Sequence, residues 1–134
     1  MPIIIVKLQT EPPLYALSGA VFGTNVTIVI SKGDVLRFEL TNLYQYPTNQ
    51  YPFWIKTAPE IGQENAVTTG IKGAGQGKMD GLLIWETTNI SEGTYYYEAE
   101  HNAGVGGMIR VGPKFEGTTM RYCLYIYIIM LISY

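Results

Sequence analysis

Histidine and cysteine are almost absent from this chain of 134 residues, which has one of each, His101 and Cys123. A single cysteine cannot form a disulfide within one copy, so cysteine pairing reveals nothing about the redox compartment. A single histidine likewise excludes any site that needs two imidazoles from one copy. His101 is the only conventional catalytic base. The sequence offers no set of a nucleophile, a base and an acid that includes it. We therefore predict a protein that is not an enzyme and has no cofactor.

Charge is also scarce, since charged residues make up 15% of the chain and the net charge is −2. No basic stripe is present, which argues against a nucleic-acid partner. The apolar run at residues 122–134 is shorter than the about 20 residues that a membrane-spanning helix needs, so no membrane span is expected. The first residues lack the basic leader, apolar core and cleavage site of a signal peptide, and we expect a protein made in the cytoplasm.

Glycine, tyrosine and apolar residues are abundant, with 15 glycines, 11 tyrosines and 47% apolar residues. This mixture predicts an all-β protein, because β-branched and aromatic residues favour strands and glycine favours turns. Apolar and polar residues alternate at 26–30 and 36–40, and the turn at 32–34 between them predicts a β-hairpin. Further strands are predicted at residues 3–8, 14–18, 53–57, 81–87, 94–99 and 108–111.

Five segments in a fixed order carry a resemblance to a known family. They are Tyr15–Gly19, Ile28–Phe38, Tyr51–Thr57, Ala66–Gly70 and Gly93–Val111. Together they resemble a cupredoxin, or plastocyanin-like domain, and are most similar to the small domains of marine bacteria and of virion proteins of cyanobacterial phages. The resemblance covers residues 14–112 and implies a Greek-key β-sandwich of about seven strands.

The resemblance also implies that the copper ligands of the family are lost. Cupredoxins hold copper with two histidines, one cysteine and usually a weakly bound methionine. The first histidine corresponds to Tyr51, the cysteine to Glu98 and the methionine to Gly104 or Val105. Only His101 is kept, at the position of the second histidine. The implied site is therefore a degenerate copper site without metal.

The former ligand positions suggest a replacement for the metal. We hypothesise that Tyr51, Glu98 and His101 converge in a hydrogen-bonded cluster, because a carboxylate beside an imidazole favours the ionised form of both. The alternative is that Glu98, Glu100 and His101 point to water. A weak metal site of His101 with Glu98 or Glu100 is a third possibility.

Two other features invite a functional interpretation. The glycine-rich segment 70–78 lacks the residues of a phosphate-binding loop and is interpreted as a flexible loop. Aromatic side chains at Tyr44, Tyr46, Tyr51 and Trp54 could form a surface for a glycan or a protein, although such residues more often pack strands and anchor loops.

The C-terminal segment differs from the rest of the chain. We divide the chain into a strand or arm at residues 1–13, the cupredoxin-like domain at 14–112, and a hinge with an apolar arm at 113–134. An uncharged run rich in tyrosine and isoleucine would aggregate if left in water. It can add an edge strand to its own sheet, or pair with another subunit or protein, which we favour because both of its faces are apolar. The predicted interface residues are Tyr122, Leu124, Tyr125, Ile126, Tyr127, Ile128, Ile129, Leu131 and Ile132.

These observations together predict a structural or assembly protein. The resemblance implies a place in a phage virion, as a capsid decoration, cement or tail-associated protein. The partners would be other virion or assembly proteins, or further copies of this chain, held through the C-terminal arm. The alternatives are a glycan- or receptor-binding module and a copper-binding electron-transfer protein.

Overall fold

Strands form all the regular structure in the part of the chain that the computed structural model describes, residues 3–45 and 49–114. Over these residues there is no helix long and apolar enough to cross a membrane. The strands are β1 (Ile4–Thr10), β2 (Pro13–Gly19), β3 (Gly23–Thr24), β4 (Ile28–Ser31), β5 (Val35–Thr41), β6 (Tyr44–Gln45), β7 (Asn49–Gln50), β8 (Phe53–Lys56), β9 (Ile71–Gly73), β10 (Gly81–Glu86), β11 (Gly93–Ala99) and β12 (Gly106–Gly112).

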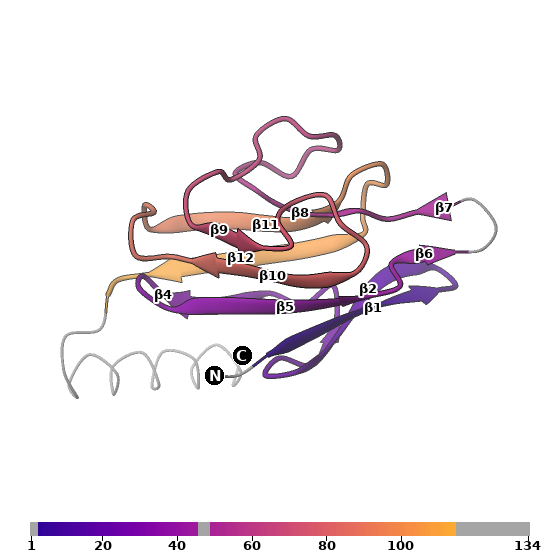
Figure 1. Cartoon of the computed structure of the whole chain (residues 1–134), viewed down its shortest axis with the longest axis horizontal. Helices are drawn as coiled ribbons and strands as arrows, with labels where there is room; N and C mark the ends of the chain where they lie inside the picture. The colour runs from indigo at the N-terminus through magenta and orange to yellow at the C-terminus, as the bar shows by residue number, and fades with distance from the viewer. Residues whose placement is uncertain (1–2, 46–48, 115–134) are drawn as a thin grey trace, which may run out of the picture.

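Two mixed sheets pack face to face (Figure 1). The larger sheet has six strands in the order β3-β2-β1-β5-β10-β9, and the smaller has four in the order β4-β12-β11-β8, while β6 and β7 pair separately. Each of the two sheets contains one parallel pair, β1 with β5 and β4 with β12. The fold is an all-β sandwich, and the prediction of this class is confirmed.

The N-terminal strand β1 is an inner strand of the larger sheet. It pairs with β2 along its whole length and with β5 over residues 4–7. Ile4 and Val6 lie on the same side of the strand and are both buried in the core, as period-two alternation requires. Residues 4–10 therefore belong to the sandwich, which corrects the boundary expected at residue 13 and the idea of an N-terminal arm at residues 3–6.

The hairpin predicted between residues 26 and 40 does not form, because β4 and β5 lie in different sheets. The turn between them is tight: the Asp34 carboxylate accepts the N–H of Ser31 at 2.9 Å, and Gly33 has a φ of 101°. This turn carries the chain across the sandwich rather than back along the same sheet (Figure 1). Alternating apolar residues fit both arrangements, since two strands can share a core by facing each other as well as by pairing.

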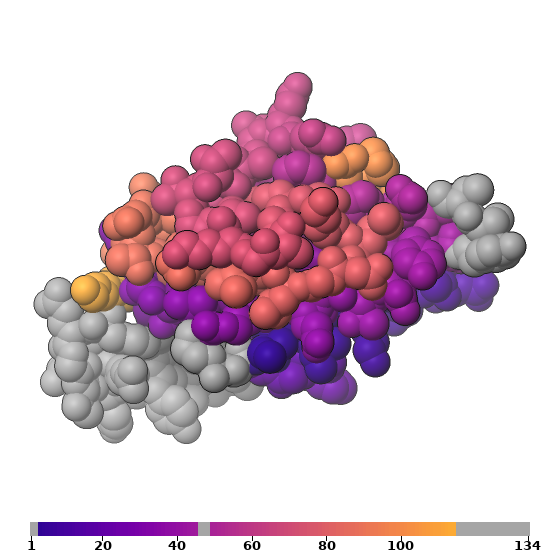
Figure 2. All heavy atoms as spheres, viewed as in Figure 1, coloured from indigo at the N-terminus to yellow at the C-terminus, as the bar shows by residue number. Residues whose placement is uncertain are grey.

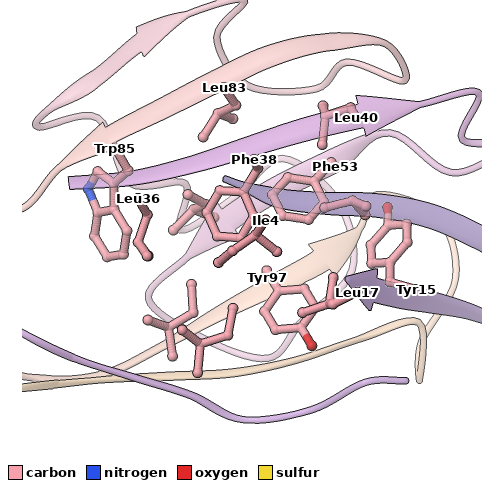
Figure 3. Close-up of a cluster of buried hydrophobic side chains, with 14 of the residues drawn as sticks. Ile4, Tyr15, Leu17, Leu36, Phe38, Leu40, Phe53, Leu83, Trp85 and Tyr97 are labelled. Carbon is pink, nitrogen blue, oxygen red and sulfur yellow. The ribbon is translucent and has the colours of Figure 1, made fainter. Parts of the chain in front are cut away.

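Aromatic rings join the two sheets at the centre of the core (Figure 3). Phe53 on β8 lies with its ring centroid 5.0 Å from that of Phe38 on β5 and 5.4 Å from that of Tyr15 on β2. Within its own sheet it lies 5.9 Å from Tyr97 on β11. Trp85 on β10 is also fully buried and contacts Tyr95 edge to face. These rings account for much of the apolar surface that folding removes from water.

Candidate functional site

The end of β11 and the loop at residues 100–105 hold the positions at which copper ligands were expected. Strand alternation turns Tyr97 and Ala99 into the core, where both are buried, and leaves Glu98 and Glu100 on the outer face of the smaller sheet. The residue that faces inward at this end is therefore Ala99. Glu98 does not converge with the buried Tyr51, which corrects the expected cluster.

Packing and backbone hydrogen bonds close the interior at this end of the sandwich. Tyr51 and Val105 are both buried, the Tyr15 hydroxyl donates to the backbone carbonyl of Tyr51 at 2.6 Å, and the N–H of Ala99 donates to the carbonyl of Val105 at 2.9 Å. The inward side chains are a phenol, a methyl and an isopropyl group. These groups do not fit copper, which needs imidazole nitrogen and thiolate sulfur as donors.

Two buried tyrosines tie strands and loops together through their hydroxyl groups. Tyr15 reaches Tyr51, and the Tyr97 hydroxyl donates to the carbonyl of Val26 at 2.6 Å. Burial raises the pKa of Tyr15 and of Tyr97 well above the usual tyrosine value. Both phenols are therefore neutral structural donors at physiological pH.

A polar cluster does form, but its centre is Glu100. One carboxylate oxygen of Glu100 lies 2.8 Å from His101 Nε2, and the other accepts Trp54 Nε1 at 2.9 Å and Gln63 Nε2 at 3.1 Å. The Glu100 side chain is 13% exposed and that of His101 is 61% exposed. The cluster connects β8, the loop after it and the end of β11, so its geometry indicates a link between segments. Sequence reasoning weighed Glu100 only as a solvent-facing residue or a weak metal ligand.

The described residues offer little to a metal ion. No group of three or more histidine, cysteine, aspartate or glutamate side chains lies close enough to hold one in residues 3–45 and 49–114. The possible pair of His101 and Glu100 supplies two ligand types, of which the imidazole is largely in water. Two such groups make a weak site, because a protein cage for a transition metal normally supplies three or four ligands.

Lys56 is a buried lysine that the sequence analysis did not identify. Its side chain is 1% exposed, and its Nζ donates to the backbone carbonyls of Glu60 and, at 3.1 Å, of Gly62. The segment between β8 and β9, which projects from the body of the sandwich in Figures 1 and 2, supplies both carbonyls. A buried ammonium group needs such partners, so Lys56 holds this segment against the outer face of the smaller sheet.

The glycine-rich segment 70–78 covers the outer edge of β8. Gln76 acts like a short strand, since its side-chain oxygen accepts the N–H of Ile55 at 2.9 Å and its side-chain nitrogen donates to the carbonyl of Ile55 at 2.8 Å. Gly77 lies so close to Trp54 that a Cβ atom would be 2.7 Å from the indole ring. The interpretation as a flexible loop missed this role, because a lone glutamine between glycines has no distinctive sequence pattern.

The four aromatic residues predicted to form a binding surface do not share one surface. Tyr51 is buried, Trp54 is half-buried with its indole nitrogen bonded to Glu100, and Tyr44 is exposed. Tyr46 lies outside the described residues, as do all the predicted interface residues between 122 and 132. The structure therefore provides no aromatic platform from Tyr44, Tyr51 and Trp54.

An apolar hollow of about 300 Å³ lies at the β4 edge of the sandwich. Both sheets and the segment before β3 contribute to it, and its lining includes the apolar residues Ile4, Val21, Ile30 and Leu36 together with Asp34. Phe22, the next residue in the chain after Val21, is 84% exposed. An exposed large aromatic residue beside an apolar hollow is typical of an interaction surface.

Comparison of the sequence with models of known protein families finds none that matches, and no curated protein matches it either. The class of the protein consequently rests on its fold and on the chemistry of its side chains. It is an all-β sandwich, and the residues buried at the end of its interior near the 100–105 loop are Tyr51, Ala99 and Val105, which pack in the core.

Proposed function

We propose that this protein is a non-enzymatic structural module that assembles with other copies of itself or with other proteins of a larger particle. The proposal is supported by the chemistry of the side chains that face inward at this end of the sandwich, because the phenol of Tyr51, the methyl of Ala99 and the isopropyl group of Val105 lack the imidazole and thiolate donors that copper needs. It leaves surfaces and termini as the means by which the molecule acts.

The observation that carries the proposal is the apolar hollow at the β4 edge, because β12, the last strand of the described residues, ends beside β4. Gly112, the last residue of β12, accepts a hydrogen bond from the N–H of Lys32 at 2.9 Å, immediately after β4. Residues 113–121 separate this point from the apolar segment, and an extended chain of that length reaches about 30 Å. We propose that residues 122–132 of one copy bind in the hollow of a second copy.

The biological setting that suits such a module is a phage virion, in which it would act as a capsid decoration, cement or tail-associated protein. The support for this setting is the resemblance of residues 14–112 to domains of phage virion proteins. The particle would be assembled in the host cytoplasm.

Sedimentation velocity of the full chain tests the proposal. We expect the wild type to self-associate at micromolar concentration and the double variant Ile126→Lys with Ile128→Lys to be monomeric, because two buried charges oppose binding in an apolar hollow. Thr118→Lys with Thr119→Lys adds the same charge to the same terminal segment and is expected to leave assembly intact. A wild-type chain that stays monomeric alone and in the presence of its native particle would contradict the proposal.

A second pair of variants examines the hollow itself. Val21→Lys introduces a charge into its lining, and we expect this variant to assemble at least tenfold more weakly than the wild type. Ile61→Lys changes an exposed apolar residue that does not line the hollow and serves as the control. Equal weakening by both variants would show that the hollow is not the binding site.

A further inference from the structure

A second hollow, of about 320 Å³, lies on the outer face of the smaller sheet. It is formed by β11, β12, the loop between them and the segment that follows β8. The side chains that line it include those of Pro59, Tyr96 and Met108, with the carboxylate-bearing Glu98 among them. The volume corresponds to the small end of ligand pockets and accommodates a ligand of a few carbon and nitrogen atoms.

The register of β11 with β12 explains why the hollow exists. Tyr96 lies opposite Met108, and Glu98 lies opposite Gly106. Gly106 has a φ of 146° and passes so close to β11 that a side chain there would collide with the backbone of Tyr97. The strand geometry therefore excludes a side chain from the position facing Glu98. The space beside the carboxylate stays open, with an aromatic ring and a thioether next to it.

The charge of Glu98 has no direct partner among the described residues. Its carboxylate takes part in none of the ion pairs or side-chain hydrogen bonds found within residues 3–45 and 49–114. Burial raises the pKa of Glu98, while the positive charge of Lys56 lowers it and the negative charge of Glu60 raises it. The Lys56 ammonium donates to backbone carbonyls and is in neither of the two ion pairs.

We propose that this hollow binds a small organic cation, an alkylammonium or alkylguanidinium group, with its charge against Glu98 and its carbon chain against Tyr96 and Met108. A carboxylate that lacks a partner in a partly desolvated site is stabilised by a charge-assisted hydrogen bond from such a cation. The π face of a tyrosine and a polarisable thioether add favourable contacts for the same group. A single carboxylate makes a poor site for a metal ion, and an anion would be repelled.

The cation can come from a free amine or guanidine, or from a lysine or arginine side chain of a protein. Titration of the full chain with butylguanidinium tests the shared chemistry, with the Met108 methyl resonance as reporter and the Met79 methyl, which does not line the hollow, as internal control. A dissociation constant on the order of 1 mM is expected for a ligand of this size. Neutral butylurea, of the same shape, is expected to bind at least tenfold more weakly.

The Glu98→Gln variant should bind butylguanidinium and butylurea equally, whereas Glu92→Gln, which removes an exposed carboxylate outside the hollow, should behave as wild type. A short peptide with one central arginine then distinguishes the sources: tighter binding than butylguanidinium assigns the site to a protein partner, and weaker binding assigns it to a free cation. Equal binding of butylguanidinium and butylurea to the wild type, or no shift of the Met108 methyl, would overturn the proposal. Assembly of the chain is a separate measurement, so failure here leaves the proposed function unaffected.

Discussion

The two edge strands of the smaller sheet, β8 and β4, differ in how far their outer edges are covered. The outer edge of β8 is covered: Ile55 bonds to both ends of the Gln76 amide, and Phe53 exchanges two backbone hydrogen bonds with residues 77 and 78, at 2.9 and 3.0 Å. Beside β4, the described residues supply one side-chain hydrogen bond, in which the Asp34 carboxylate accepts the N–H of Ser31, and the apolar hollow opens there. The comparison teaches that, within residues 3–45 and 49–114, the sandwich protects one edge from association and places no such cover on the other.

The largest expected difference between the edges is in core stability. Phe53→Ala on β8 removes a ring that contacts both sheets and should lower the free energy of unfolding by about 3–5 kcal/mol. Val29→Ala on β4 truncates a half-buried side chain and should cost about 1 kcal/mol or less. Chemical denaturation of both variants measures the difference. Similar losses would mean that β4 carries as much of the core as β8.

The covering of β8 can be broken by Gln76→Ala. The N–H of Ile55 would lose its partner in a half-buried position, so the free energy of unfolding should fall by about 1–3 kcal/mol. Gln50→Ala, at an exposed position, should change stability by less than about 0.5 kcal/mol. Hydrogen exchange at the Ile55 amide should accelerate in the Gln76 variant only. Unchanged protection there would show that the amide is not the edge cover.

The β4 edge can be opened further by Asp34→Ala. This variant removes the acceptor of the Ser31 N–H and should cost about 1 kcal/mol, comparable to the loss of a capping side chain. Asp34→Asn keeps an acceptor oxygen and should recover most of the loss. Thermal unfolding of the two variants measures this difference. Equal melting temperatures for Asp34→Ala and wild type would show that the Asp34 carboxylate does not stabilise the turn.

The smallest effect is expected on β11, which lies between the two edges, and it depends on pH. Burial raises the pKa of Glu98 in the folded protein above the reference value of 4.5. Protonated Glu98 therefore favours folding below pH 4.5, and this contribution to the free energy of unfolding is lost as the pH rises through the folded pKa. Glu98→Gln should therefore raise the melting temperature at pH 7, with the gain shrinking as pH falls toward 4.5. A constant difference across this range would show that Glu98 titrates normally.

Local patterns in the sequence were sufficient for the strands of the core. The predictions at residues 14–18, 53–57 and 81–87 agree with β2, β8 and β10 to within about a residue at each end, because long alternating or apolar runs specify their own buried face. The strands β3, β6, β7 and β9 were not predicted, since they have two or three residues and depend on neighbours distant in the chain.

The candidate site was predicted less completely. Sequence reasoning paired His101 with Glu98 in the expected cluster, whereas the carboxylate that lies against His101 is that of Glu100. Glu98 on β11 and Glu100, which directly follows this strand, are the same residue type two positions apart, so no local pattern distinguishes them. The indole of Trp54 and the amide of Gln63, from another strand and a distant loop, make the difference by bonding to Glu100.

The sequence by itself determined that the sandwich of the described residues is all-β and that one copy cannot supply two imidazoles to a metal, because residue composition and alternation are properties of the chain alone. Only the tertiary structure decided that β4 and β5 face each other across the core, that Glu100 is the partner of His101 and that Gln76 covers β8. Each of these depends on residues far apart in the chain, and their positions are set by the packing of two sheets around one shared core.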